Sequence, residues 1–411
     1  MSYKNLRVFS YTTENDNKLN EEFEKRYNSY TTIHTDLKIY PFINEFRKTS
    51  EKYELFYLPL PELLLLEERI KYNSEELIKL KDELPGIVKD KITISTLIEE
   101  IQSTNETEGI RSSRHEIGEA VNNRNENGKA KKRFQGIVNM YMNINEKTFE
   151  FVDAPEKIRN IYDALFEGEI QKKDWPDGEI FRKDPVDIKG DTKIIHTGNP
   201  TEESIIKDMW KLVKFMNNKD IPFLSKCFIS HYFLEYIHPF YDGNGRLGRF
   251  VISSYLSRKL DPFTGLSVSN AVNDNKKKYY DAFTDVSHPK NFGEITFFIK
   301  TMLELVIDGQ NKMIEQLKEA KLKMNFVKTY MNNITNVSEE AKGVLYGLIQ
   351  FNLFDVYSTQ LTDNQFTKVF KMTRYLLDKL LAELVDNDYL VKCKFKPSVH
   401  KLSDTVLEAI E

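Results

Sequence analysis

The sequence predicts a mainly α-helical protein with one small β-hairpin in its core and a C-terminal domain of the winged helix-turn-helix type. Apolar residues recur at three- and four-residue spacing in most segments, which is the pattern of helices with one buried face. At residues 186–197, apolar and polar residues alternate instead, a pattern typical of a hairpin. Near the C-terminus, three helix-like segments precede a second alternating stretch, which is the element order of a winged helix.

The length of the chain predicts more than one folded unit. At 411 residues it is longer than one ordinary hydrophobic core requires, so we expect two or three domains. Residues 1–57 are polar and rich in aromatic side chains, and they predict a partly ordered leader that packs on the core. The core domain is expected to span residues 58–320, and the winged-helix-like domain residues 321–411.

The composition excludes several classes of protein. Hydrophobic residues make up 40% of the chain, which is enough to fill the expected cores. A net charge of -4 excludes a surface that is basic throughout. Cys227 and Cys393 lie far apart and match neither a disulfide framework nor a CxxC metal site. Because the sequence has no apolar N-terminal segment and no run of bilayer length, we expect a cytoplasmic protein with no membrane partner.

The helical core is expected to consist of segments separated by clear turn signals. Pro59 and Pro61 precede the first helix, and the run Leu84-Pro85-Gly86 separates it from the next. The run Ser113-Arg114-His115-Glu116 predicts a capping box at the start of a further helix. The expected core helices are residues 63–80, about 92–109, 134–142, 158–165, 201–216, 223–237, 250–256, 279–283 and 293–317.

The helix at about residues 92–109 places a carboxylate at the end of an apolar face. Four apolar side chains share that face: Ile94, Leu97, Ile98 and Ile101. The same steps lead on to Thr104 and Glu108, and Gly109 ends the helix. A carboxylate in that position requires a cation or strong hydrogen-bond donors. Glu108 therefore predicts an arginine partner elsewhere in the fold.

The hairpin at residues 186–197 is the exception in a helical core. Its side chains alternate around a Gly-Asp turn, and the residues that we assign to it are Val186, Ile188, Ile194, Ile195, His196 and Thr197. A two-stranded hairpin is marginally stable by itself. We therefore expect this hairpin to pack against the core or to bind a partner.

The passage between residues 237 and 250 carries the chemistry. The run Gly243-Asn244-Gly245 precedes a buried helix, so its main-chain N–H groups are free to bind an anion. Arg246 and Arg249 are three residues apart and project from one face of that helix. Two guanidinium groups at a helix N-terminus are unfavourable unless an anion offsets their charge, which predicts a phosphate site.

Two residues just before the glycines add a metal and a base to this site. Asp242 can hold Mg²⁺ between its carboxylate and bound phosphates. His238, four residues earlier, can take a proton from an incoming hydroxyl group. Together these residues predict phosphoryl or nucleotidyl transfer without a covalent enzyme intermediate.

These residues resemble a known family. Residues 238–249 resemble the Fic motif HxFxDGNGRxxR, in which Asp or Glu occupies the fifth position, at every fixed position. Residues 104–109 resemble the inhibitory motif of the family, which is Ser or Thr, three residues, Glu, and Gly or Asn. The hairpin lies where the family has its target-binding flap, and Tyr279 with Tyr280 resembles the paired tyrosines near the nucleotide base. The resemblance covers roughly residues 58–305 and implies a Fic-type helical core.

The resemblance implies transfer of AMP from ATP to a Ser, Thr or Tyr hydroxyl of a target protein, or of the protein itself. The implied residue roles are His238 as general base, Asp242 as Mg²⁺ ligand, Gly243, Asn244 and Gly245 at the α-phosphate, Arg246 at the β- and γ-phosphates, and Tyr279 at the base. Arg249 is implied to bind the γ-phosphate in the active state and Glu108 in the inhibited state. Thr104 fills the first position of the inhibitory motif.

The C-terminal segment keeps a second interpretation open. Helices are expected at residues 341–351, 364–370 and 373–385, followed by a two-stranded wing at residues 389–402. The wing carries four lysines: Lys392, Lys394, Lys396 and Lys401. The segment could bind DNA, or it could serve docking or homodimer formation. The alternative to a transferase is therefore a DNA-binding regulator whose Fic core senses nucleotide or transfers another phosphorylated group.

Overall fold

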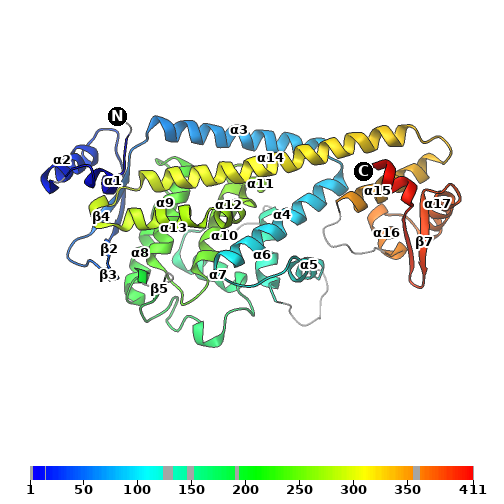
Figure 1. Ribbon diagram of the computed structural model, residues 1–411. Coiled ribbons are helices and arrows are strands. Elements are labelled where there is room, and N and C mark those ends of the chain that lie inside the picture. The colour runs from blue at the N-terminus through cyan, green and yellow to red at the C-terminus, as the bar shows by residue number, and fades with distance from the viewer. Residues whose placement is uncertain are drawn as a thin grey trace. The chain divides into compact units, whose positions relative to one another are not determined.

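The computed structural model describes residues 3–13, 15–123, 133–145, 152–189, 194–354 and 362–410 (Figure 1). The chain forms two compact units. Unit 1 consists of Met1–Glu75 and Leu97–Asn311, and unit 2 consists of Glu76–Thr96 and Lys312–Glu411. The sequence-based boundary at residue 320 did not include residues 76–96 in the second unit. Among the described residues, no helix combines the length and apolar character that a membrane span requires.

Unit 1 is mostly helical, with short two-stranded sheets. The elements from its first residue to the flap are α1 (Leu6–Ser10), α2 (Asp16–Tyr27), β1 (Ile33–Ile39), β2 (Phe42–Ile43), β3 (Phe46–Arg47), β4 (Tyr53–Tyr57), α3 (Pro61–Glu83), α4 (Gly86–Thr107), α5 (Arg114–Asn122), α6 (Gln135–Asn145), α7 (Pro155–Leu165), the 3-10 turn η1 (Lys172–Asp174), β5 (Asp187–Lys189) and β6 (Ile194–Thr197). The elements that follow are α8 (Glu202–Met216), α9 (Phe223–Ile237), α10 (Asn244–Lys259), α11 (Pro262–Gly265), α12 (Val268–Asp274), α13 (Lys276–Ser287), the 3-10 turn η2 (Pro289–Asn291) and α14 (Thr296–Asn332). Helices α3, α4 and α14 contribute residues to both units.

The described part of residues 3–57 forms regular elements, which differs from the partly ordered leader that the sequence suggested. β1 and β4 form an antiparallel pair in which Ile33 lies opposite Tyr57. Arg26 of α2 reaches the fully buried carboxylate of Glu294 at 2.9 Å, and Tyr3 donates a hydrogen bond to the same group at 2.8 Å. The polar composition of this segment hid these elements, because its charged groups are neutralised inside the fold rather than in solvent.

The centre of unit 1 is the helix pair α9 and α10 (Figure 1). Nearly every residue of α9 is buried, as expected for a helix that is apolar on all sides. α9 packs against α8 and α10, and α10 also contacts α6, α11 and α12. The chain reverses between the two helices over residues 238–243, so the end of α9 and the start of α10 meet. The predicted motif forms this reversal.

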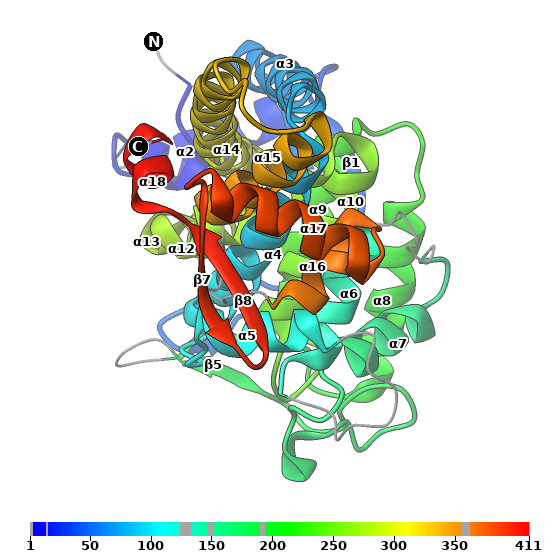
Figure 2. The same ribbon diagram turned by 90° about the vertical axis from the view of Figure 1, so that its right-hand side faces the viewer.

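Unit 2 contains the elements that the sequence predicted for the tail, in the predicted order. They are α15 (Glu339–Leu353), α16 (Asp363–Phe370), α17 (Arg374–Asp386), β7 (Leu390–Phe395) and β8 (Ser398–Leu402). A final helix, α18 (Asp404–Ile410), was not predicted. The β7–β8 hairpin packs against α16 and α17 (Figure 2). Buried Asp363 holds this arrangement by accepting hydrogen bonds from Arg374 at 3.1 Å and from His400 at 3.0 Å. The four wing lysines are exposed, and DNA binding by this unit stays a prediction.

Candidate active site

The end of α9 presents a strained histidine. His238 is the C-cap of α9 and has a left-handed backbone, with a φ of 52°. Its Nδ1 atom is buried, which leaves Nε2 as the ring nitrogen available for chemistry. Burial, together with His196 and Arg182, lowers the pKa of His238 to about 3. The imidazole is therefore neutral at pH 7 and can accept a proton.

The start of α10 offers an anion site. Its N-cap, Gly243, has a φ of 83°, which a side chain would strain, and no side chain caps the helix. The first N–H groups of any helix lack intrahelical partners. Asn244 fixes the turn, because its amide group accepts from the Phe240 N–H at 3.0 Å and donates to the Phe240 carbonyl at 2.8 Å. The free N–H groups thus open onto the site beside His238.

Arg249 lies on the first turns of α10 and is held by the end of α4. Only 1% of its side chain is exposed, and Nη2 donates to Glu108 Oε1 at 2.8 Å. Thr104 accepts two more bonds, at its hydroxyl from Nε at 2.8 Å and at its carbonyl from Nη2 at 3.1 Å. Burial alone would lower the pKa of Arg249, but the Glu108 carboxylate outweighs it and the pKa is raised. Glu108 thus has the arginine partner that its position demanded.

Arg246, the second arginine, has a carboxylate partner that the sequence analysis missed. Its side chain is 3% exposed, and Nη1 donates to Glu169 Oε2 at 3.1 Å. The guanidinium also lies over the ring of Phe166, 4.4 Å from its centroid. Burial raises the pKa of Glu169, while the charge of Arg246 lowers it. Glu169 follows α7 in a loop, where no periodic pattern could single it out.

Asp242 differs from the arginines because its side chain is 56% exposed. One carboxylate oxygen accepts the Gly243 N–H at 2.7 Å, and the other lies 4.0 Å from Arg246 Nη2. Among the described residues, no three His, Cys, Asp or Glu side chains gather as a metal site. A single accessible carboxylate fits Mg²⁺, which binds through one or two carboxylates, phosphates and water.

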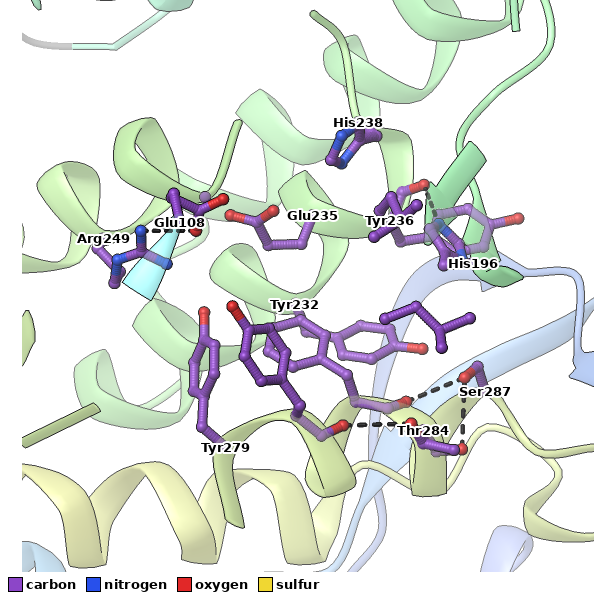
Figure 3. A pocket seen from close by; sticks show the side chains of 15 residues that line it. Glu108, His196, Tyr232, Glu235, Tyr236, His238, Arg249, Tyr279, Thr284 and Ser287 are labelled. Atoms are coloured by element: carbon purple, nitrogen blue, oxygen red, sulfur yellow. Dashed lines mark hydrogen bonds and ion pairs between the residues drawn. The ribbon is translucent and has the colours of Figure 1, made fainter. Parts of the chain in front are cut away.

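The predicted hairpin forms one wall of a pocket at this site (Figure 3). β5 pairs antiparallel with β6, with Ile188 opposite His196, and the turn at residues 190–193 lies outside the described residues. Ile188, Ile195 and His196 line the pocket. Val186 accepts the Gly198 N–H at 3.0 Å, while Ile194 pairs with Lys189 and Thr197 bonds Asp187 at 2.8 Å.

Aromatic residues from α9 and α13, among them Tyr279, also line the pocket. Tyr279 is buried, and its hydroxyl is hydrogen-bonded to Nε2 of His231 at 2.7 Å. Both groups are neutral, because burial raises the pKa of Tyr279 and lowers the pKa of His231 to about 3. The remaining nitrogen of His231 lies 4.0 Å from Glu235. A tyrosine that bonds a histidine in this way has a fixed ring at the pocket wall.

Glu235 is a further pocket residue that the sequence analysis overlooked. It lies three residues before His238 on the same buried helix and lines the pocket (Figure 3). Its Oε1 atom is buried without a hydrogen-bond partner, and burial raises the pKa of Glu235 to about 8. A carboxyl group on a helix that is apolar on all sides was the signal, and it is the same signal that identified Glu108.

Glu100 fixes α4 to the core of unit 1. This carboxylate is fully buried, accepts the hydroxyl of Ser253 at 2.9 Å and accepts the N–H of Ser269 at 2.7 Å. Burial raises the pKa of Glu100 to about 7, although these hydrogen bonds lower it. The folded protein therefore binds this proton more tightly than the unfolded chain does.

We expect this difference to make stability depend on pH. The contribution of Glu100 is complete below its ordinary pKa of 4.5 and is lost as the pH rises through about 7. The gap between the two pKa values corresponds to roughly 3 kcal/mol. Glu100→Gln, which resembles the protonated acid, should therefore be more stable than the parent at pH 8 and nearly equal at pH 4.5.

Urea unfolding at both pH values tests this expectation. Glu99→Gln is the matched control, because Glu99 is the neighbouring carboxylate, is 30% exposed and pairs with Arg114. The control should follow the parent at both pH values. Equal stability of the Glu100→Gln variant and the parent at pH 8 would contradict the assigned shift.

Comparison with known proteins agrees with this geometry. A sequence model of the Fic/DOC family matches residues 151–256. A Fic family protein from Desulfovibrio desulfuricans G20 has the same fold, with a TM-score of 0.52 and 17% identity over 85% of this chain and 98% of that chain. A Fic domain containing signaling protein from Bacteroides thetaiotaomicron VPI-5482 matches with a TM-score of 0.45 and 16% identity over 61% and 97% of the two chains. Fic-1 (residues 134–508) from C. elegans gives a TM-score of 0.42 and 17% identity over 62% of this chain and 75% of that chain.

The family match covers the flap, the helix α9 and the glycine-containing turn, which together build the site. Residues 151–256 of this chain therefore match the Fic/DOC family.

Proposed function

We propose that this protein is an autoinhibited protein adenylyltransferase, which moves AMP from ATP to a Ser, Thr or Tyr hydroxyl of a target protein. The observation that most supports this proposal is the Arg249–Glu108 pair at 2.8 Å, at a helix N-terminus and in the same pocket as His238. A buried guanidinium beside free N–H groups is a binding site for phosphate. A carboxylate that occupies it takes the position of that phosphate.

In the proposed reaction, the hydroxyl oxygen of the target attacks the α-phosphorus of ATP. Nε2 of His238 takes the hydroxyl proton as the new P–O bond forms. The bond to the β-phosphate breaks, and pyrophosphate leaves with the bonding electrons. Burial keeps the imidazole of His238 neutral at pH 7, which is the form that can accept the proton.

The phosphates would be held by the start of α10. Its free N–H groups face the α-phosphate, and Arg246 and Arg249 supply charge-assisted hydrogen bonds to the outer phosphates. Tyr279, Tyr280 and the flap residues Ile188 and Ile195 line the part of the pocket that remains for the nucleoside. The flap has short antiparallel strands, and pairing with an extended target segment would bring a hydroxyl to His238.

Asp242 would hold Mg²⁺ at the exposed mouth of the site. When bound, Mg²⁺ neutralises phosphate charge and orients the pyrophosphate group. The exposed carboxylate of Asp242 is free for this role, because its second oxygen makes no contact shorter than 4.0 Å with Arg246.

Inhibition would follow from competition for one guanidinium. While Glu108 occupies Arg249, the γ-phosphate lacks its arginine and ATP binds in an unproductive position. Thr104 strengthens the inhibited arrangement, because it accepts two hydrogen bonds from the same guanidinium. The resting protein is therefore expected to have low activity.

Intact-mass measurement tests the transferred group. The protein is incubated with Mg²⁺ and, in separate reactions, with ATP, GTP, UTP or CTP, both as the parent and as Glu108→Gly. An increment of one AMP group with ATP supports the proposal. An increment of one phosphate group, or a larger yield with another nucleotide, would reject adenylyl transfer in favour of a different donor reaction.

A further inference from the structure

The last carbonyl groups of α9 are hydrogen-bonded by one segment, residues 182–199, which contains the flap. The C-terminal carbonyls of a helix have no intrahelical donors and must find others. Here the carbonyls of four consecutive residues accept bonds from two side chains and two N–H groups. The acceptors are Tyr236, Ile237, His238 and Pro239, and the donors are the side chains of His196 and Arg182, with the N–H groups of Asn199 and Arg182. The main chain at His238, the residue proposed as base, is thus held in place by hydrogen bonds from residues 182–199.

Arg182 makes the central contacts in this set. Its Nε donates to the carbonyl of His238 at 2.8 Å, and its own N–H donates to Pro239 at 3.3 Å. Nη2 lies 3.5 Å from the carbonyl of Ile237, and Nη1 donates to the carbonyl of Asp184, which precedes the flap. One guanidinium therefore links the entrance of the flap to the residue proposed as base.

Arg182 is an unusual structural arginine, because its side chain is fully buried and all its acceptors are main-chain carbonyls. Within the described residues, it has no carboxylate in ion-pair range. Burial lowers its pKa to about 10, so it stays charged at pH 7. A buried charge without a counter-ion is costly, and a fold retains it where the directional donors of the guanidinium are required.

Gly198, at the far end of the flap, confirms how closely these groups pack. A methyl group at this position would lie 2.5 Å from Arg182 Nη2 and 2.9 Å from His238 Cβ. The flap exit, the arginine and the histidine therefore occupy one tightly packed layer. A change in any of the three would displace the others.

We infer that Arg182 is a positioning residue for His238, which fixes the left-handed backbone of the histidine and couples it to the flap. This inference rests on the proposed function, in which His238 is the base. Arg182 itself would not touch ATP or the target. Its loss should therefore slow the chemical step without weakening nucleotide binding.

Steady-state kinetics in the Glu108→Gly background test this role. For Arg182→Met, we expect kcat to fall about 100-fold, the cost of a displacement of roughly 1 Å in a catalytic group, with an unchanged KM for ATP. Arg182→Lys, which keeps the charge but not the planar fork, should recover part of the rate. An unchanged kcat, or a loss that lies only in KM, overturns the inference.

Two further variants keep this test decisive. Arg159→Met is the matched control, because Arg159 also donates to a main-chain carbonyl, that of Ile180, at 2.6 Å, but belongs to α7. It should keep the parent kcat. If Arg182→Met does not fold, Gly198→Ala and Arg182→Lys replace it, and both must lower kcat more than the control does.

An activity-independent measurement separates this inference from the proposed function. In protein labelled at histidine, the imidazole signal of His238 is identified by its loss in His238→Ala. In Arg182→Met it should shift or broaden, while the signal of His115, an exposed histidine on α5, stays unchanged. An unchanged His238 signal overturns the positioning role, whether or not any group transfer is found. Absence of transfer in the Glu108→Gly variant, together with a shifted His238 signal in Arg182→Met, counts against the proposed function alone.

Discussion

In the His238→Ala variant, transfer of α-phosphate label from ATP should fall by about 10²- to 10⁴-fold, the usual contribution of a general base. The reason is that the hydroxyl of the target then keeps its proton while it attacks. The start of α10 is unchanged by this substitution, so ATP should bind with the parent affinity. Radiolabel incorporation and equilibrium ATP binding, measured on the same preparation, test both parts.

His115→Ala is the control for this loss. His115 is exposed on α5 and does not line the pocket, so its removal should leave incorporation unchanged. Incorporation at the parent rate in His238→Ala would exclude His238 as the base. A loss of ATP binding in that variant would instead assign His238 to the nucleotide site.

The Glu108→Gly variant should transfer label at least about tenfold faster than the parent, a change that corresponds to roughly 1.4 kcal/mol. Removal of the carboxylate frees Arg249, which then keeps its hydrogen bonds to the hydroxyl and the carbonyl of Thr104. The guanidinium can then bind the γ-phosphate. Initial rates at saturating ATP measure the effect.

Glu106→Gly separates release of Arg249 from loosening of the helix. Glu106 lies two residues earlier at the same end of α4, and its exposed carboxylate bonds Gln102 at 2.9 Å and Asn273 at 3.1 Å. Both substitutions introduce a glycine at the end of the helix, but only one removes the partner of Arg249. Equal activation in the two variants would show that helix loosening, and not the ion pair, controls the rate.

Much of the site could be predicted because it lies on regular elements. The carboxylate Glu108 was visible as a misfit on a periodic apolar face, and the arginines followed a turn with two glycines. Most of the longer helices of both units were predicted for the same reason, but α14 ends at Asn332 rather than at residue 317, and α1, α2, α11, α12 and α18 were not predicted. The elements that carry the candidate site can thus be predicted from the spacing of apolar residues and glycines in a single sequence.

The parts that were missed depend on contacts between segments without periodicity. Arg182 and Glu169 lie in loops, where neither charge nor spacing distinguishes a buried residue from an exposed one. The leader was underestimated because Arg26 and Glu294 are 268 residues apart, so each looks like a surface charge in the sequence. Only the folded chain shows which charges are neutralised by a distant partner.

Gly245 lies beside the Arg249–Glu108 pair, where the carboxylate of Glu108 and the γ-phosphate of ATP would compete for one guanidinium. A methyl group there would lie 2.3 Å from Glu108 Oε1 and 3.1 Å from Arg249 Nη1, so the carboxylate and the guanidinium lie directly against the backbone of Gly245. On the proposed function, the carboxylate and the γ-phosphate are then mutually exclusive ligands, and linkage requires each to weaken the other by the same factor. The factor by which Glu108→Gly tightens ATP binding should equal the factor by which saturating ATP increases amide hydrogen exchange at the end of α4 in the parent.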